Sequence, residues 1–327
     1  MVTQFKENES ERARKLDGAR VAEEIKREAA EDVARLKSAY GVTPRLVVVR
    51  VGDDPASAVY VRNKVRLCEE LGLGSEHVAL PAETTTAELL EVVESLNRRD
   101  EVDGVLVQLP LPKGVDESRI IEAIDPSKDV DGFHPINVGR MMLRQPSLLP
   151  CTPAGIVELL VREGVEIAGA RVCVVGRSNI VGRPVAELLL QRDATVTICH
   201  SRTRRIAEVT READILIVAV GRASFIRAEH VRAGATVVDV GMNKLTDEDE
   251  VRDFFGDEAG KRLKAVRERG FTLVGDVHPL QVGAVAGRLT PVPGGVGLLT
   301  VAMLMRNTIQ AARLRRGIEE ERKKGKG

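Results

Sequence analysis

The N-terminal part of the chain alternates apolar residues at helical spacing with short, uninterrupted apolar runs. Pro44 separates a long stretch of good helix formers from a β-branched run, and Gly72 ends a second helical pattern. Strands that alternate with helices in this way form a mostly parallel sheet. The elements predicted here are helices over residues 18–39 and 57–71 and from Thr86, and strands over residues 46–51 and 104–109.

A second alternating series follows a stretch rich in Pro, Gly and Asp. Residues 110–150 are predicted to form loops around one short helix, which marks the edge of a domain. After this stretch, helical patterns alternate again with apolar runs, as in a nucleotide-binding domain. The elements predicted in this series are helices from Thr152 to Gly164 and from Pro184, and strands over residues 171–175, 195–199, 214–220, 236–240 and 271–274.

Three segments near the C-terminus have distinct patterns. Residues 244–269 are strongly charged and are predicted to form a helical excursion at the surface, to which no activity is assigned. Residues 298–315 have the pattern of a long helix, and residues 319–327 that of a solvated, disordered tail.

Composition limits the classes of function. The 327 residues are 43% hydrophobic, enough for a sizeable core, and 49 Lys and Arg balance 49 Asp and Glu for a net charge of +0. Nucleic acid is not expected as a partner, because there is no general positive field and the aromatic content is only 2%. No run approaches the ~18 apolar residues of a membrane span, so a cytoplasmic protein without a membrane partner is predicted. The cysteines and histidines are dispersed, so reduced thiols and no metal are expected.

The turn after residues 171–175 is a candidate ligand site. Gly176 follows a predicted buried strand and Gly182 precedes a helix, which lets backbone N–H groups approach an anion. The spacing is not G-x-G-x-x-G, so the glycines alone leave open a dinucleotide site or an ordinary strand-to-helix turn. Ser201 and its neighbours stand where an NAD-binding domain has a carboxylate. With Arg177 in the turn, these donors favour NADP over NAD, and the alternative is a solvated basic loop.

Tyr60 and Lys64 form a candidate catalytic pair. They stand four residues apart, about 40° around a helix, so both side chains can project into one cleft. A desolvated Lys can exchange protons near neutral pH, although the same spacing is common on surface helices. Gln108 stands near the carboxyl end of a predicted strand, the edge where parallel sheets place ligands.

Two loops add further candidates. Asp129 and Asp131 lie in a turn rich in Pro and Gly, where carboxylates either bind N–H groups of a ligand or cap the turn. Residues 290–297, TPVPGGVG, combine a rigid approach with a surface free of side chains, which suits a flat ligand or a plain loop.

Together and in this order, these segments resemble the bifunctional methylenetetrahydrofolate dehydrogenase/methenyltetrahydrofolate cyclohydrolase family of one-carbon metabolism. They extend over nearly the whole chain, and several are too long and unusual to be chance matches. The motifs are KLDG at Lys15, YVRNK at Tyr60, VQLPLP at Val107, KDVDGFHPINVGR at Lys128, PCTPAGIVELL at Pro150, VVGRSNIVGRP at Val174, ADILIVAVG at Ala213, VVDVGMN at Val237, GDV at Gly275 and TPVPGGVG at Thr290.

The resemblance implies an α/β fold in which two α/β domains flank a cleft, the second being a Rossmann-like doubly wound parallel sheet. It implies a folate-binding catalytic domain of residues 1–150 plus 298–327, with a returning C-terminal helix, and an NADP-binding domain of residues 151–297. It also implies a homodimer that oxidises 5,10-methylenetetrahydrofolate with NADP. Hydrolysis of the 5,10-methenyl product would then give 10-formyltetrahydrofolate for purine biosynthesis.

The resemblance further implies roles for single residues. Lys64 would assist the attack of water, and Gln108 would orient Lys64. Asp131 would hold the pterin-like ring, and Tyr60 would stack on the p-aminobenzoyl part. The remaining residues would line the folate pocket, at Val107, Pro293, Gly294 and Gly295, and the NADP site, at Gly176, Arg177, Ser178, Ile180, Val181, Ser201, Val220 and Gly221.

One segment departs from the family pattern. The family's glycine-rich close is followed by Pro-Met-Thr, whereas Leu298 and Leu299 precede Thr300 here, a change expected to alter the start of the last helix. Three other interpretations are open: a related two-domain NADP dehydrogenase for shikimate or amino acids, a dehydrogenase with a silent hydrolase, and a non-catalytic folate- or NADP-binding scaffold.

Overall fold

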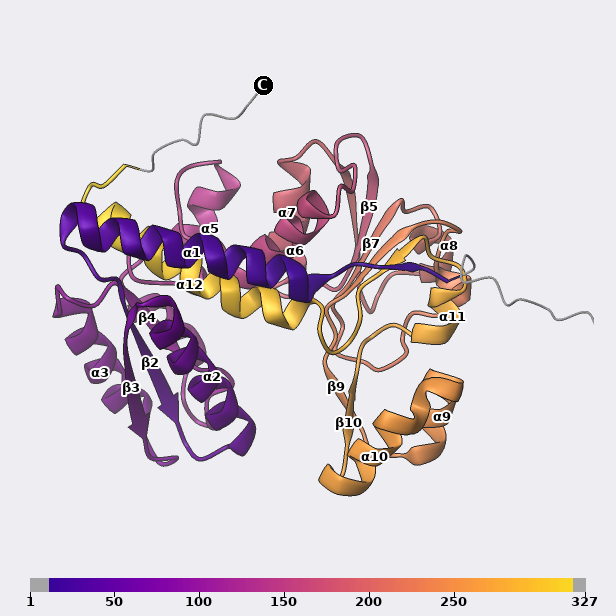
Figure 1. Ribbon diagram of the computed structural model, residues 1–327, viewed down its shortest axis with the longest axis horizontal. Coiled ribbons are helices and arrows are strands. Elements are labelled where there is room, and N and C mark those ends of the chain that lie inside the picture. The colour runs from indigo at the N-terminus through magenta and orange to yellow at the C-terminus, as the bar shows by residue number, and fades with distance from the viewer. Residues whose placement is uncertain (1–11, 320–327) are drawn as a thin grey trace, which may run out of the picture. The chain divides into compact units, whose positions relative to one another are not determined.

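A computed structural model describes residues 12–319 (Figure 1). The chain divides into two compact units, and each is named here after its main parallel sheet. Of the described residues, 22–151 and 300–319 form the three-stranded unit, and 12–21 and 152–299 form the six-stranded unit. The predicted tail over residues 319–327 lies outside the described residues, except for its first residue. Among the described helices, none has the length and apolar character needed to cross a membrane.

The three-stranded unit is built on the predicted alternation of strands and helices. Its parallel strands β2 (Arg45–Val51), β3 (Gly74–Leu80) and β4 (Gly104–Val107) lie in the order β3-β2-β4. In Figure 1, helices α2 (Pro55–Leu71) and α3 (Thr86–Arg98) lie on opposite sides of this sheet. The centre of β2 is fully buried, as expected for an apolar run covered on both faces.

The sequence analysis missed β3 and one helix of the three-stranded unit. β3 is a half-exposed edge strand with the mixed sequence GSEHVAL, which has no apolar run, and its pairing with β2 decides its conformation. Residues 110–150 contain two helices instead of the single one predicted, α4 (Glu117–Ala123) and α5 (Pro135–Met142). α5 begins at a proline, and the His134 ring accepts a hydrogen bond from its first turn.

Two long helices complete the three-stranded unit. α1 (Gly18–Tyr40) and α12 (Val296–Arg315) run side by side in Figure 1, and an ion pair of 3.2 Å joins Asp32 to Arg313. α12 begins two residues before its predicted start at position 298. Of the two leucines that depart from the family pattern, Leu299 is fully buried and Leu298 is exposed.

The six-stranded unit has a Rossmann-like parallel sheet. Its strand order is β1-β11-β8-β7-β5-β6, and each neighbouring pair is parallel. The predicted strands over 171–175 and 195–199 are confirmed without change as β5 and β6. The elements of this unit are α6 (Cys151–Arg162), β5 (Arg171–Val175), α7 (Gly182–Leu190), β6 (Thr195–Cys199), α8 (Ile206–Thr210), β7 (Ile215–Val218), β8 (Thr236–Asp239), α11 (Pro279–Gly283), β11 (Arg288–Leu289) and β1 (Arg14–Lys15).

The beginning of the described chain lies in a different unit from the one expected. The predicted boundaries grouped residues 1–150, but β1 pairs with β11, so residues 12–21 belong to the six-stranded unit. β1 consists of two exposed charged residues and has no pattern that reveals a strand. The expected divisions at positions 150 and 298 lie one or two residues from those observed, at 151 and 300.

The charged excursion is confirmed as mainly helical. It contains β9 (Asn243–Leu245), α9 (Glu248–Phe255), a short 3-10 turn and α10 (Gly260–Arg269). The prediction that 271–274 continues the parallel series is wrong, because β10 (Thr272–Val274) pairs antiparallel with β9 in a separate two-stranded sheet. Arg262 donates hydrogen bonds to the carbonyls of Leu273, at 3.0 Å, and Val292, at 2.7 Å. The excursion is thereby joined to the glycine-rich loop.

A buried carboxylate anchors the end of α12, and this contact gives a stability prediction. Asp103 is fully buried, accepts the Arg45 N–H at 3.0 Å, and pairs with Arg315, at 2.9 Å, and Arg316. We expect Asp103→Asn to lower the free energy of unfolding by about 2 kcal/mol, because an amide cannot satisfy all these donors.

Denaturant unfolding followed by circular dichroism measures this change. The matched control is Asp249→Asn, because Asp249 is an almost fully exposed carboxylate that also pairs with an arginine. The control is expected to cost less than about 0.5 kcal/mol. Equal losses in the two variants would contradict an anchoring role for Asp103.

Candidate active site and nucleotide site

Lys64 and Gln108 meet at the carboxyl end of the three-stranded sheet. Lys64 Nζ, on α2, donates a 2.9 Å hydrogen bond to Gln108 Oε1. Gln108 directly follows β4, and its backbone N–H donates to the Val49 carbonyl at 2.8 Å. Its Nε2 donates to the Leu109 carbonyl at 2.7 Å, which fixes the amide so that Oε1 faces the lysine. The lysine is therefore held by a neutral acceptor.

Lys64 and Asp131 shift each other's protonation. Burial lowers the pKa of the Lys64 ammonium, and the nearby Asp131 carboxylate opposes this shift. Burial raises the pKa of Asp131 to about 6, although Lys64 acts to lower it. A lysine with a lowered pKa beside a carboxyl with a raised pKa is suited to proton transfer near neutral pH.

Tyr60 and Val107 flank this pair in different ways. Tyr60 is 41% exposed one helical turn before Lys64, so its ring is accessible at the surface of α2. Val107 is buried at the end of β4 and belongs to the apolar core of the three-stranded unit. The structure thus brings Tyr60, Lys64, Val107, Gln108 and Asp131 to one unit.

Asp129 holds the loop that carries Asp131. Its carboxylate accepts the backbone N–H groups of Gly132, at 3.1 Å, and His134, at 2.8 Å, and the Asn137 amide at 2.9 Å. The sequence left open whether Asp129 and Asp131 bind a ligand or cap the turn, and these bonds show that Asp129 caps it. Gly132 has a φ of +74°, and a Cβ there would lie 2.4 Å from the Leu149 backbone, so the loop requires glycine.

Asn307 and Cys151 support the same loop and were not found from the sequence. Asn307 Nδ2, on α12, donates to the carbonyls of Val130 and Leu149, both at 2.8 Å. The Cys151 thiol donates to the Val130 carbonyl at 3.2 Å. A buried Asn within the mostly apolar stretch VAMLMRNTI was the one available signal, since buried amides need partners.

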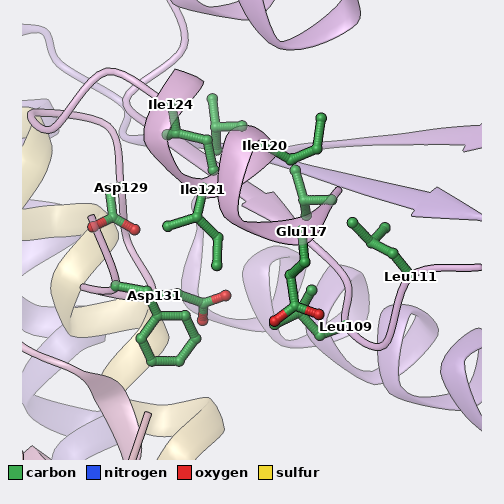
Figure 2. Close-up of a pocket in the computed structure, with 11 residues that line it drawn as sticks. Leu109, Leu111, Glu117, Ile120, Ile121, Ile124, Asp129 and Asp131 are labelled. Carbon is green, nitrogen blue, oxygen red and sulfur yellow. The ribbon is translucent and has the colours of Figure 1, made fainter. Parts of the chain in front are cut away.

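A mainly apolar pocket lies beside Asp131 (Figure 2). Ile120 and Ile121, on α4, and Ile124, directly after it, line the pocket, and the Asp129 and Asp131 carboxylates lie along another side (Figure 2). The enclosed space has a volume of only about 10 Å³, which is room for about one water molecule and far below what an organic ligand fills. The other residues that line it are Val105, Val107, Leu109, Leu111, Glu117 and Phe133.

The predicted nucleotide turn lies at the carboxyl ends of adjacent strands in the six-stranded unit. β7, β5 and β6 are neighbours, so the segments that follow them reach the same edge of the sheet. Gly176 has a φ of +126°, and a Cβ there would lie 2.2 Å from the Ala219 carbonyl oxygen. A Cβ at Gly182 would lie 2.3 Å from the Gly176 carbonyl oxygen, so both glycines are needed for this tight turn.

The other predicted cofactor residues gather at this edge. Arg177, Ser178 and Ile180 are exposed in the turn, and Val181 is half-buried. Ser178 Oγ accepts the N–H groups of Val181 and Gly182, each at 3.2 Å, which orders the start of α7. Ser201 is exposed after β6, and Val220 and Gly221 follow β7.

The Ser201 loop has an ordered, basic structure. Thr203 Oγ1 accepts the His200 N–H at 2.9 Å, and the His200 ring accepts the Arg202 N–H at 3.1 Å. No carboxylate stands in residues 200–205 to repel a phosphate on the ribose. The residues present therefore fit a phosphorylated dinucleotide.

The glycine-rich loop belongs to the six-stranded unit. Gly294 has a φ of +100°, and a Cβ at Gly295 would lie 2.5 Å from the Pro291 carbonyl oxygen, whereas Pro293 is exposed. Tyr60, Lys64, Gln108 and Asp131 all belong to the other unit. Within residues 12–319, no group of three His, Cys, Asp or Glu side chains is arranged to hold a metal ion.

One unit has a Rossmann-like parallel sheet with a glycine turn, and the other carries a cluster of a lysine, an amide and a carboxylate. These features define a two-unit, nucleotide-dependent enzyme. Family models give the same division. Residues 16–131 match the catalytic domain of tetrahydrofolate dehydrogenase/cyclohydrolase, and residues 150–316 match its NAD(P)-binding domain. The chain belongs to the tetrahydrofolate dehydrogenase/cyclohydrolase family.

Individual relatives agree with this assignment. The Bifunctional protein FolD of Koribacter versatilis is 57% identical over 302 residues, which is 92% of this chain and 97% of the relative. Crystal structures of FolD from Campylobacter jejuni (42% identity, TM-score 0.82, covering 92% of this chain and 98% of that one) and Trypanosoma brucei (37%, 0.84, 94% and 99%) have the same fold. The second is described as complexed with NADP cofactor and inhibitor.

The interaction between Lys64 and Asp131 gives a prediction for pH titration. Because the lysine charge lowers the pKa of Asp131, we expect Lys64→Met to raise that pKa above its value of about 6. Carbon-13 NMR of the aspartate carboxyl groups across pH 4–9 measures the change. Arg62→Met, which removes a charge from the exposed part of the same helix, is the control and should leave the titration unchanged. An unchanged or lower pKa in Lys64→Met would contradict the coupling.

Proposed function

We propose that this enzyme oxidises 5,10-methylenetetrahydrofolate with NADP and hydrolyses the resulting 5,10-methenyltetrahydrofolate to 10-formyltetrahydrofolate, in one-carbon metabolism. The observation that carries the proposal is the cluster of Lys64, Gln108 and Asp131, with a 2.9 Å hydrogen bond between the first two. The family match supports the folate enzyme over a shikimate or amino-acid dehydrogenase. When bound, NADP supplies the hydride acceptor for the first reaction.

In the hydrolysis, Lys64 is the group that moves protons. Its lowered pKa leaves a larger fraction as neutral amine, which accepts a proton from water as the oxygen bonds to the methenyl carbon. The ammonium then returns that proton to N5 as the bond between N5 and this carbon breaks. The second proton of the water leaves to solvent as the formyl C=O forms. Gln108 holds Nζ in one direction throughout these transfers.

The other residues bind and orient the substrate in this proposal. Asp131, ionised above about pH 6, accepts N–H groups of the pterin ring. The exposed Tyr60 ring stacks on the p-aminobenzoyl part. Val107 and the loop of Pro293, Gly294 and Gly295 are assigned to the folate pocket by the family pattern.

The turn and the Ser201 loop are proposed to select NADP. The tight turn between Gly176 and Gly182 is assigned to the pyrophosphate. Arg177 and Ser201 supply donors for the 2′-phosphate, and Ser178, Ile180 and Val181 complete the turn. Val220 and Gly221 are assigned to the nicotinamide end. A homodimer, a cytoplasmic location and a role in purine biosynthesis stay predictions, and light scattering of the purified protein tests the dimer.

The two activities can be measured on one preparation. NADPH formation from 5,10-methylenetetrahydrofolate reports the dehydrogenase, and loss of methenyltetrahydrofolate absorbance reports the cyclohydrolase. Both signals are expected. NADPH formation alone would indicate a silent hydrolase, and tight NADP binding with neither activity would favour the scaffold interpretation.

Lys64→Met separates the two reactions. We expect cyclohydrolase activity to fall by about 100-fold or more, because proton transfer to and from the substrate is lost. Dehydrogenase activity should fall less, because hydride transfer depends mainly on positioning. Arg62→Met is again the control and should retain both activities. Full cyclohydrolase activity in Lys64→Met would remove the role assigned to that lysine.

Arg177→Gln tests cofactor choice. Loss of a charge-assisted bond to phosphate should raise the KM for NADP by about 10-fold or more, with little change for NAD. Arg192→Gln, at an exposed arginine after the end of α7, is the matched control. Steady-state kinetics with both cofactors measures the effect, and a parallel loss with NADP and NAD would argue against contact with the 2′-phosphate.

A further inference from the structure

Two buried carboxylates of the six-stranded unit have no role in the function proposed above. Asp276 is fully buried in the GDV motif, and Asp239 is 4% exposed at the end of β8, in the VVDVGMN motif. Burial of a carboxylate is costly unless strong donors satisfy it. The donors at these two sites therefore indicate what each carboxylate holds in place.

Asp276 holds the loop after β7 through three consecutive backbone N–H groups. Its Oδ2 accepts from Val220 at 2.6 Å and Gly221 at 2.9 Å, and its Oδ1 accepts from Arg222 at 2.8 Å. Asn243 Nδ2 donates to the same Oδ1 at 2.9 Å. Both oxygens are thus fully used, and none of the three loop N–H groups is left to bind a ligand.

Asp239 in turn fixes the backbone that carries Asp276. Its Oδ1 accepts the Asp276 N–H at 2.9 Å, and its Oδ2 accepts the Val277 N–H at 3.0 Å. Two glycines make room for these contacts. A Cβ at Gly275 would lie 1.7 Å from Asp239 Oδ2, and one at Gly241 would lie 2.3 Å from Asp276 Oδ1. The VVDVGMN and GDV motifs therefore hold each other in place, and together they support the loop after β7.

The bonds to Asp276 also fix the direction of the carbonyl groups in the loop after β7, next to the nucleotide turn. In a trans peptide, the C=O group points opposite to the N–H group of the same unit. Because the N–H groups of residues 220–222 converge on Asp276, the carbonyls of residues 219–221 point away from it. The Ala219 carbonyl is the one that lies against Gly176 of the nucleotide turn.

We propose that Asp276 is a positioning residue that holds the loop of residues 219–222 in the shape required at the nicotinamide end of NADP. The inference rests on the proposed function, which assigns Val220 and Gly221 to this end of NADP. Asp276 acts through the loop and does not itself touch the cofactor. Its effect is therefore expected to be larger at the nicotinamide half of the dinucleotide than at the adenosine half.

The Asp276→Asn variant tests the inference by comparing two ligands. The amide is close in size to the carboxylate but presents an NH2 group to at least one of the N–H donors. Calorimetry should show NADP bound about 10-fold more weakly, while 2′,5′-ADP, which lacks nicotinamide, binds within about twofold of the unchanged protein. Dehydrogenase kcat should fall by a similar factor, with cyclohydrolase activity retained.

Two further variants keep the test decisive. Asp103→Asn also alters a buried carboxylate but in the other unit, and it should leave the ratio of NADP to 2′,5′-ADP affinity unchanged even if it unfolds earlier. Asn243→Ala removes a single neutral donor from Asp276. It should weaken NADP binding by a smaller factor in the same direction, and it decides the question if Asp276→Asn does not fold.

The possible outcomes separate this inference from the proposed function. An unchanged ratio of the two affinities in Asp276→Asn, or in Asn243→Ala if that variant must be used, would overturn the positioning role. Equal weakening of NADP and 2′,5′-ADP would also overturn it, since that result indicates general damage to the unit. If the unchanged protein binds neither ligand, the proposed use of NADP itself is wrong.

Discussion

Buried carboxylates bonded to backbone N–H groups fix the loops at the ends of the strands in both units. A carboxylate removed from water needs several donors, and a loop has N–H groups that no neighbouring strand satisfies. Asp129 meets this need around Asp131, and Asp276 meets it around residues 220–222. Each set of hydrogen bonds holds its loop in one conformation. The side chains of Lys64 and Asp131 depend on such fixed surroundings for their altered pKa values.

The sequence predicted those elements whose own residues determine them. β5 is apolar after Arg171, β6 has apolar or β-branched residues throughout, and both were placed without error. α2 was identified from its periodicity and its terminal Gly72. β3 and β1 could not be predicted, because their partners supply the reason for their extended shape. The pairing of β10 with β9 was missed for the same reason: an apolar run does not specify whether its neighbour is parallel.

The candidate site likewise combines residues that the local sequence could predict with contacts that only the fold creates. Spacing alone could place Tyr60 and Lys64 on one helix, and local position made Gln108 and Asp131 candidates. The family resemblance then gave Gln108 and Asp131 their roles. The contact between Lys64 and Gln108 depends on the register of β4 against β2, which brings distant segments to one edge. Asn307 lies on a helix near the other end of the chain, yet it holds the carbonyl of Val130. No local pattern contains such a contact.

The close packing around Asp239 and Asp276 also limits how the VVDVGMN and GDV motifs can evolve. The hydrogen of Gly275 faces the Asp239 carboxylate at a place where a methyl group would overlap with it, and Gly241 stands in the same relation to Asp276. A larger residue at Gly275 therefore demands a change at Asp239, whereas at Gly241 the Asp276 backbone nitrogen also lies 2.4 Å from the Cβ position, so a change of the Asp276 side chain alone would not make room. Both glycines should therefore persist among related sequences wherever the two aspartates do.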